Sequence, residues 1–347
     1  MSTKQRIEYI DLAKGFCIIL VVMVHIAAFY SYELPGGDFF KAFRMPLYFF
    51  LSGCFFKAYG GFTDFTKRKV NKLLIPFLFW YILTSVGVPH LQYHVFGCNC
   101  RVLHLDETVS AIFTEYYPNL PIWFLLCLFE DSLLFYGLYM LAQKFEQKST
   151  WIICGGAMLL GIIGLTLGIN RIDLPATLDS ALSALPFFAA GYVVFRKTEI
   201  LKPNRFDRYL PLLIIAAFAF VGYFCTFYSF LLNRFTLHSA LVVYPCGLLG
   251  TYGVVMLAKM LKKLPVISYI GRYSIMVLVT HVEVYNFYAA LLKRTGLPTE
   301  YAVYVNLLIT LLSYLIIIPL MKRFLPHVTA QKDVIPVETT SSNKQAK

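Results

Sequence analysis

Residues 9–25 read YIDLAKGFCIILVVMVH, and this stretch decides how the rest of the chain is interpreted. It begins with charge at Asp11 and Lys14, continues with uncharged and mostly apolar residues, and ends on His25. A helix rises ~1.5 Å per residue, so the eleven steps from Lys14 to His25 span about 16 Å. That is roughly half the thickness of a bilayer's hydrocarbon core. An ionisable group at that depth is costly and usually marks a pathway or a reaction site.

Apolar runs of similar length recur along the whole chain of 347 residues, which is 58% hydrophobic and 14% charged. This pattern predicts an all-α, polytopic transmembrane bundle of about ten helices, without room for a separate soluble domain. We expect a membrane domain over residues 1–325 and a disordered cytoplasmic tail without chemistry over 326–347. The predicted spans are Ile10–Tyr30, Phe39–Lys57, Leu73–Val95, Asn119–Ala142, Thr150–Ile169, Leu178–Phe195, Tyr209–Leu232, Ala240–Leu261, Val266–Leu292 and Tyr301–Leu325.

The basic residues indicate the orientation of these spans. With the N-terminus inside, 24 of the 31 lysines and arginines fall in cytoplasmic segments and 7 fall outside. This bias follows the positive-inside rule and places both termini in the cytoplasm. The net charge of +12 is therefore distributed for membrane topology, and nucleic acid is excluded as a partner. The first span has no small-residue cleavage site after it and is expected to stay in the mature protein.

The cysteines give little information about function. Six of them lie in apolar runs, where they are expected to act as small packing residues. Cys98 and Cys100 instead lie in a polar outer loop near His90, His94 and His104. A local disulfide and two free thiols both remain open there, and no metal site is predicted.

Five side chains are predicted to gather in the outer third of the membrane. His25 lies near the outer end of the first span, and Arg44 and Trp123 lie early in two spans that descend from outside. His281 and Glu283 approach the same level on the ninth span. Charged groups at that depth normally face the bundle interior or a water-filled cavity.

Each of these groups also has a structural interpretation. A membrane histidine such as His25 or His281 often makes hydrogen bonds between helices. Arg44 could extend to the outer headgroups, and Trp123 could be an interfacial anchor. Glu130, deeper in the fourth span, is expected to pair with a neighbour and receives no catalytic role.

A second group of charges lies at the inner face. Arg68, Lys69 and Lys72 fall within about one turn of each other before the third span, and Lys14 lies at the inner end of the first. Such cations can set topology and meet anionic lipid. They equally suit a polyphosphate ligand such as a nucleotide-bearing cofactor, and the two interpretations are compatible.

Several segments of the chain, in the same order, resemble the acyltransferase 3 family of integral membrane enzymes, which acylate bacterial surface and secreted glycans. The similar segments are YIDLAKGFCIILVVMVH, FRMPLYFFLSG (Phe43–Gly53), the basic stretch into Leu73-Leu74-Ile75-Pro76, PIWFLLCLF (Pro121–Phe129) and IGRYSIMVLVTH (Ile270–His281). Each is weak alone, and together they extend along most of the chain.

The family's motifs map onto individual residues of this chain. Its basic residue followed by ten residues and a histidine maps onto Lys14 and His25, and its basic pair before the third helix maps onto Lys69 and Lys72. Lysine replaces the usual arginine at these basic positions, and it lacks arginine's bidentate fork. Tyr48 occupies a usual phenylalanine position.

The resemblance implies an O-acyltransferase, most simply an O-acetyltransferase, in the bacterial plasma membrane. Acyl-CoA would enter from the cytoplasm, with its phosphates on Lys14, Arg68, Lys69 and Lys72. A hydroxyl of a glycan or glycolipid would be acylated on the outer side, with His25 as general base. This requires a tunnel between a cytoplasmic cofactor pocket and a water-accessible cavity at His25.

In this interpretation Arg44 would stabilise developing negative charge or orient the acceptor. Trp123, His281 and Glu283 would contact the acceptor. The donor could be acetyl-CoA or a succinyl analogue, and the acceptor and oligomeric state stay open. The alternative function is a transporter or flippase in which His25, Arg44 and His281 line a path without covalent chemistry.

Overall fold

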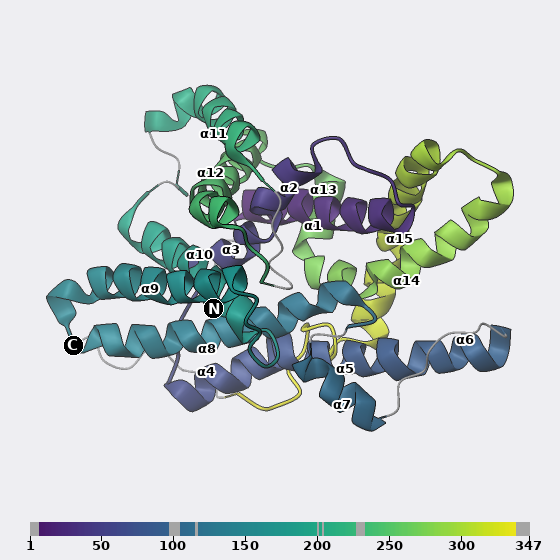
Figure 1. Cartoon of the computed structure of the whole chain (residues 1–347), viewed down its shortest axis with the longest axis horizontal. Coiled ribbons are helices and arrows are strands. Elements are labelled where there is room, and N and C mark those ends of the chain that lie inside the picture. The colour runs from purple at the N-terminus through teal and green to yellow at the C-terminus, as the bar shows by residue number, and fades with distance from the viewer. Residues whose placement is uncertain are drawn as a thin grey trace.

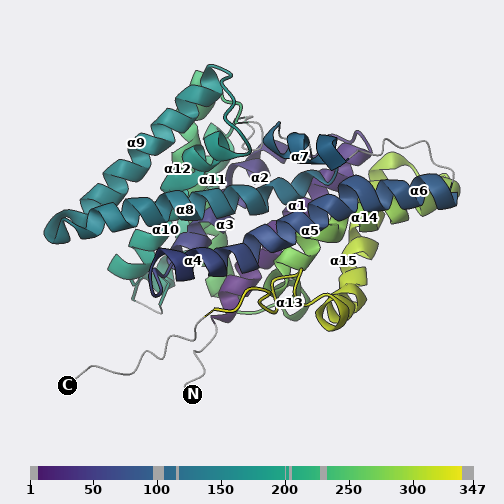
Figure 2. The same cartoon turned by 90° about the horizontal axis from the view of Figure 1, so that it is seen from below.

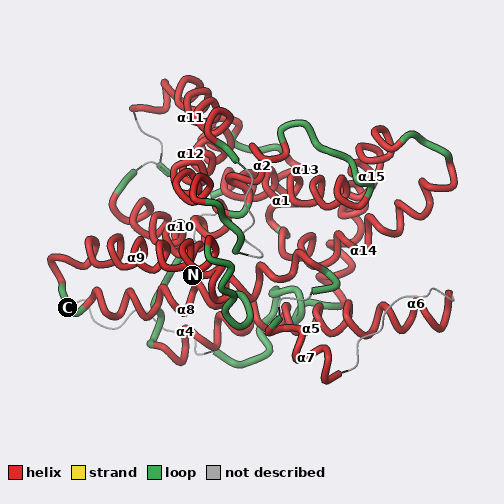
Figure 3. The backbone as a smooth tube through the Cα atoms, viewed as in Figure 1, coloured by secondary structure: helices red, strands yellow, loops and turns green. Residues whose placement is uncertain are grey.

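The computed structural model describes residues 7–96, 105–114, 117–199, 201–202, 205–226 and 233–337. All regular structure in these residues is helical, without a strand (Figure 3). The α-helices are α1 (Glu8–Phe29), α2 (Gly37–Arg44), α3 (Pro46–Cys54), α4 (Phe62–Lys69), α5 (Ile75–Ile82), α6 (Val88–Phe96), α7 (Leu105–Phe113), α8 (Trp123–Gln143), α9 (Ser149–Ile169), α10 (Leu178–Lys197), α11 (Leu210–Phe224), α12 (Leu237–Leu261), α13 (Pro265–Arg272), α14 (Ser274–Leu292) and α15 (Thr299–Phe324). Shorter turns are η1 (Val70–Leu74), η2 (Leu83–Gly87), η3 (Leu120–Ile122), η4 (Glu146–Lys148), η5 (Arg205–Tyr209) and η6 (Lys293–Thr295).

Within the described ranges, nine helices are long and apolar enough to cross a membrane. The predicted helical bundle is therefore confirmed, but the span Phe39–Lys57 is not one helix. It is divided into α2 and α3, which meet at Met45 (Figure 1). The cause is Pro46, which has no amide hydrogen to continue the hydrogen-bond ladder. The span Val266–Leu292 is likewise divided, into α13 and α14, at Tyr273.

The predicted third span begins earlier than expected, at Phe62, and contains two π-helical turns. Figure 2 shows α4, α5 and α6 as one long rod that includes η1 and η2. A π-turn widens a helix by one residue and is frequent at functional sites. Here η1 contains Asn71 and Lys72, so the basic stretch lies where the helix is irregular.

Two pairs of helices cross with their backbones in direct contact. Helix α3 packs on α10 at Gly53 and Gly191, and α1 packs on α13 at Gly15 and Gly271. A Cβ atom added at any of the four would overlap a backbone carbonyl oxygen of the opposite helix. Glycine is therefore required at both crossings. These contacts fix α1 and α3, the two helices that carry the first two motifs.

The end of the chain differs from its prediction. Residues 326–337 do not lie free, because Asn71, Lys72 and Trp80 all donate hydrogen bonds to backbone carbonyls in this segment. The side chain of Thr329 is fully buried there. A polar composition predicted disorder, but these bonds satisfy the segment's polar groups and fix it against η1 and α5. Residues 338–347 lie outside the described part of the chain.

Cationic side chains gather at the end of the bundle where α1 begins. Lys263 pairs with Glu8 at 2.8 Å, Lys259 with Asp207 at 2.6 Å, and Lys72 with the tail at 2.9 Å. This end is the one that the positive-inside rule assigns to the cytoplasm. Its orientation in a membrane stays a prediction.

Candidate active site

A cavity of about 420 Å³ opens between α1, α3, the α4–η1 segment, α8 and the start of α14. This volume lies within the range of small-molecule sites, about 300–1,000 Å³. The four cations predicted to bind a cofactor all line it: Lys14, Arg68, Lys69 and Lys72. Its remaining lining is mostly apolar. Lys14 lies more than fifty residues before the other three cations in the sequence, and the fold brings all four to one cavity.

Arg68 and Lys72 have acidic partners at the cavity edge. The Nε atom of Arg68 lies 3.1 Å from both carboxylate oxygens of Asp64, and its guanidinium lies 4.5 Å from the centre of the Tyr59 ring. Lys72 Nζ lies 2.9 Å from Asp333 Oδ1. These contacts place the two side chains beside the cavity.

Lys69 lies deeper and is balanced by a buried acid. Its ammonium is 5.5 Å from the Phe65 ring centre and 5.9 Å from that of Phe188, within the range of cation–π contacts. Asp131 on α8 is fully buried and interacts electrostatically with Lys69. Neither oxygen of Asp131 receives a hydrogen bond from the described residues. Lys69 is thus the electrostatic partner of this buried carboxyl group.

Tyr48 explains one departure from the family pattern. Its hydroxyl donates a 2.9 Å hydrogen bond to the backbone carbonyl of Lys14. The oxygen that a phenylalanine would lack is thus satisfied, and it joins α3 to α1 at the cavity wall. Tyr48 and Lys14 both line the cavity.

The two predicted histidines lie together. The ring centres of His25 and His281 are 5.4 Å apart, with the planes inclined at 52°. His281 is fully buried, and its Nδ1 lies 2.9 Å from the carbonyl oxygen of Val277. A carbonyl only accepts, so Nδ1 must carry the hydrogen and donate it. In the neutral ring Nε2 then carries a lone pair and can accept a hydrogen bond. It has no hydrogen-bond partner among the described residues.

Arg44 lies close to α1, within electrostatic reach of His25. It ends α2, and the next residue, Met45, lines the cavity. Its guanidinium interacts electrostatically with His25 and also with Cys17, eight residues earlier on α1. An arginine held beside α1 in this way does not extend to the outer headgroups.

The cavity does not extend to the histidines as the open tunnel predicted from the sequence would. Neither His25 nor His281 lines the cavity, whose wall ends at Val21 on α1 and Leu278 on α14. Val21 precedes His25 by four residues, or one helical turn, which is about 6 Å of rise. The cavity wall thus ends one helical turn before His25.

Trp123 and Glu283 were also predicted to lie near the two histidines, and the structure places them differently. Trp123 is buried in the same apolar core as Val22 and Ile26 of α1, so it does not face lipid headgroups. Glu283 is half-buried, two residues from His281, and residues two apart on a helix do not face each other. Glu130 accepts a 2.6 Å hydrogen bond from Thr177, which confirms its expected pairing with a neighbour.

Among the described residues, no cluster of three or more His, Cys, Asp or Glu side chains has the arrangement of a metal site. His104, Cys98 and Cys100 lie outside those residues, so their state stays a prediction. The six described cysteines are all free, and Cys17, Cys54, Cys127 and Cys246 are buried.

Comparison with known proteins identifies the family. A family model described as "Acyltransferase domain", that of the acyltransferase 3 family, matches residues 7–322. The chain belongs to the acyltransferase 3 family.

This acyltransferase is also similar to two curated proteins called nodulation protein NolL. The one from Sinorhizobium fredii (strain NBRC 101917 / NGR234) is 26% identical over 219 residues, covering 60% of this chain and 54% of that protein. The one from Mesorhizobium japonicum (strain LMG 29417 / CECT 9101 / MAFF 303099) is 26% identical over 183 residues, covering 49% and 44%. The chain thus spans about half the length of these relatives. No solved structure matches it.

Three polar residues near the acyltransferase cavity were missed by the sequence analysis. Asp131 and Asn71 are fully buried, and Asp333 lies in the tail. The two adjacent acids inside an apolar run, Glu130 and Asp131, were the available signal for Asp131. Nothing in the local sequence distinguishes Asn71 or Asp333, because their roles arise from a contact across more than 250 residues.

Proposed function

We propose that this membrane acyltransferase moves an acyl group, most simply acetyl, from cytoplasmic acyl-CoA to a hydroxyl of a surface or secreted glycan or glycolipid. The observation that carries the proposal is the convergence of Lys14, Arg68, Lys69 and Lys72 on one cavity. Helix α1 joins this cavity to His25, so one element connects a cationic pocket to the His25–His281 pair.

The donor half of the proposal follows from charge. Coenzyme A carries a diphosphate and a 3′-phosphate, and lysine and arginine are the usual side chains that bind such groups. The apolar remainder of the wall, which includes Ile18, Val21 and Leu278, suits the pantetheine arm. The arm would point along α1 toward His25 and bring the thioester to the deep end of the cavity.

Transfer then requires a base, because a sugar hydroxyl is far too weak an acid to attack as an alkoxide at neutral pH. His25 removes the hydroxyl proton as the oxygen attacks the thioester carbonyl. Arg44 stabilises the resulting oxyanion. The carbon–sulfur bond breaks, the thiolate takes the proton from His25, and free coenzyme A leaves. The lone pair of His281 Nε2 can accept a hydrogen bond from His25 or from the acceptor.

Acyl transfer requires the cavity to open further at Val21 or Leu278, since neither histidine lines it. Side-chain rotations and small helix shifts of this size occur on the nanosecond to millisecond scale. The closed state keeps water away from the thioester until an acceptor is present.

The test uses the full chain in lipid nanodiscs with [14C]acetyl-CoA and a membrane extract from cells that lack this gene. We expect label to enter a glycan or glycolipid, and His25→Ala to lower the transfer rate by about 10²–10⁴-fold, the usual contribution of a positioned base. His238→Ala is the matched control, because His238 lies in the first turn of α12 and outside the site.

Full transfer by well-folded His25→Ala protein would remove His25 from the mechanism. Binding of a glycan without any consumption of acetyl-CoA by the unaltered protein would instead favour the transporter.

A further inference from the structure

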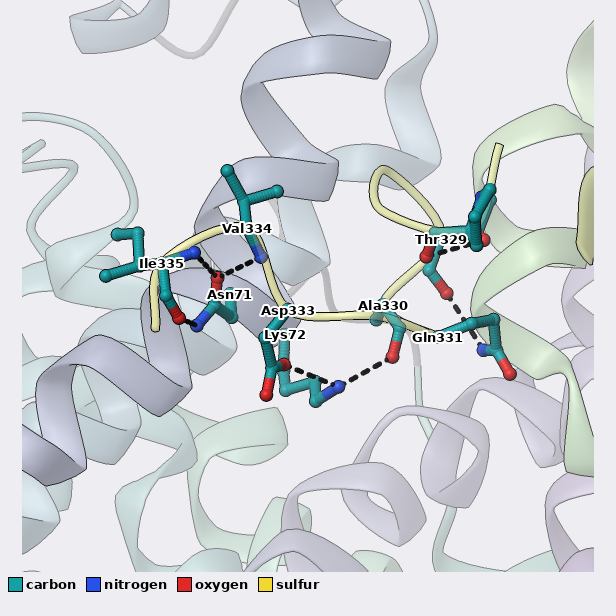
Figure 4. Close-up of polar contacts among 9 residues, drawn as sticks. Asn71, Lys72, Thr329, Ala330, Gln331, Asp333, Val334 and Ile335 are labelled. Carbon is teal, nitrogen blue, oxygen red and sulfur yellow. Dashed lines mark hydrogen bonds and ion pairs between the residues drawn. The ribbon is translucent and has the colours of Figure 1, made fainter. Parts of the chain in front are cut away.

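Residues 326–337, which we call the C-terminal strap, are bound by η1. The same turn carries Lys72, which lines the cavity. Figure 4 shows Asn71 and Lys72 of η1 facing this strap. The Asn71 carboxamide accepts hydrogen bonds from the amides of Val334 at 2.9 Å and Ile335 at 2.8 Å. It also donates to the carbonyl oxygen of Ile335 at 2.8 Å. One buried side chain thus binds the strap backbone by three hydrogen bonds.

Lys72 makes the second attachment. Its ammonium donates to the carbonyl oxygen of Ala330 at 2.9 Å and lies 2.9 Å from Asp333 Oδ1 (Figure 4). The same ammonium lines the donor cavity. An ammonium has three hydrogens to donate, so the strap engages two of them. The carboxylate of Asp333 therefore occupies a position beside Lys72 that a phosphate oxygen could also take.

The two attachments differ in how easily they exchange. Asn71 is fully buried, and its loss would leave buried polar groups without partners. The Lys72–Asp333 pair is open to water, with 44% and 34% of the two side chains exposed. Ion pairs of this exposure are weak and readily replaced. The strap is thus fixed at Asn71 and exchangeable at Lys72.

We propose that Asp333 is a built-in competitor of the donor's phosphates for Lys72, so the strap sets the affinity of the donor site. The proposal rests on the proposed function. A carboxylate and a phosphate both accept hydrogen bonds from Lys72 and repel each other, so donor binding displaces Asp333 from the lysine. Ligands without an anionic group near Lys72 leave Asp333 paired with Lys72.

The first experiment measures the dissociation constant of coenzyme A on the full chain in nanodiscs. Asp333→Asn keeps the shape of the side chain and removes its charge. We expect it to bind coenzyme A about threefold to tenfold more tightly, because both the competing pair and the charge repulsion are removed. The matched control is Glu8→Gln, which neutralises another exposed carboxylate paired with a lysine at the same end of the bundle. We expect its affinity to stay unchanged.

Equal or weaker binding by Asp333→Asn would overturn the proposal while leaving the donor assignment intact. If neither the unaltered protein nor any variant binds coenzyme A, the proposed function fails first and the competitor role fails with it. Lys72→Ala separates these cases further, since it should bind coenzyme A more weakly than the unaltered protein and respond little to an added Asp333→Asn change.

The second experiment needs no variant and measures hydrogen exchange of peptides from residues 326–337 in the unaltered protein. We expect exchange to become faster when coenzyme A is added, because the ligand loosens the strap at Lys72. Unchanged or slower exchange would contradict competition, and slower exchange would make the strap a lid over the bound ligand.

Discussion

Asp131 is the residue whose environment is least expected from its neighbours. It lies within the apolar helix α8, it is fully buried, and the described residues donate it no hydrogen bond. Removing a carboxylate from water costs several kcal/mol, on the order of the total stability of many domains. The electrostatic interaction with Lys69 offsets part of this cost. The interaction is thus structural, in addition to the donor-binding role proposed for Lys69.

This dependence predicts a coupled effect on stability. Lys69→Met should lower the free energy of unfolding by about 3–5 kcal/mol, because it leaves Asp131 buried without its cation. Lys69→Met combined with Asp131→Asn should recover most of the loss, since the neutral amide needs no counter-ion. Thermal unfolding in detergent measures both, with Lys67→Met as the exposed control on the same helix. Additive losses in the double variant would show that the two residues are independent.

At the scale of the element, the crossing of α3 and α10 is the most restrictive contact. Gly53 ends the FRMPLYFFLSG motif and packs directly on the backbone of Phe188 in α10, so packing explains the motif's last residue. The crossing holds α3 in place, and α3 supplies Tyr48 and Ser52 to the donor cavity. A change at the crossing would therefore reach the site through the backbone.

Gly53→Ala should prevent stable folding or lower the melting temperature strongly, because the new methyl group would overlap a backbone carbonyl on α10. Gly155→Ala in α9 is the matched control, since a Cβ there meets no atom within 4 Å. It should fold normally, as glycine-to-alanine changes in open helix positions are neutral or slightly stabilising. Fluorescence-detected size exclusion during heating compares the two. An equal response would show that the helices can separate without loss.

The elements predicted from sequence were those that follow from a repeating pattern. Twenty-residue apolar runs predicted the spans, and the sequence placed Lys14 and His25 at different levels of one helix, of which only Lys14 lines the cavity. Pro46 and Tyr273 divide two spans because local backbone geometry overrides hydropathy there. The π-turn at η1 and the attachment of the tail to Asn71 arise from long-range contacts, which no local pattern encodes.

For the whole molecule, the arrangement separates two chemical environments along one helix. Cations and their partners surround the start of α1, and the histidine pair lies toward its end. A donor and an acceptor could then approach from opposite sides of a membrane without sharing a pocket. This arrangement depends on orientation, which the bias of basic residues predicts.

A reporter fusion tests the orientation directly. Green fluorescent protein attached after Lys347 should fluoresce, because it matures in the cytoplasm, and alkaline phosphatase at the same place should be inactive. Fusions after Arg171, in the loop between α9 and α10, should give the opposite pair of results. Active phosphatase at the C-terminus would invert the bundle and place the cationic cavity outside, where acyl-CoA is absent.

The attachment of residues 330–335 to η1 has a practical consequence for anyone who purifies this enzyme. An affinity tag attached after Lys347 would be separated from Asp333 by 14 residues, and a charged or bulky tag would disturb the contact between Asp333 and Lys72. Kinetic constants for the donor would then depend on the expression vector. Comparing an N-terminally tagged preparation with a C-terminally tagged one, before and after protease cleavage, would turn this artefact into a measure of mechanical coupling.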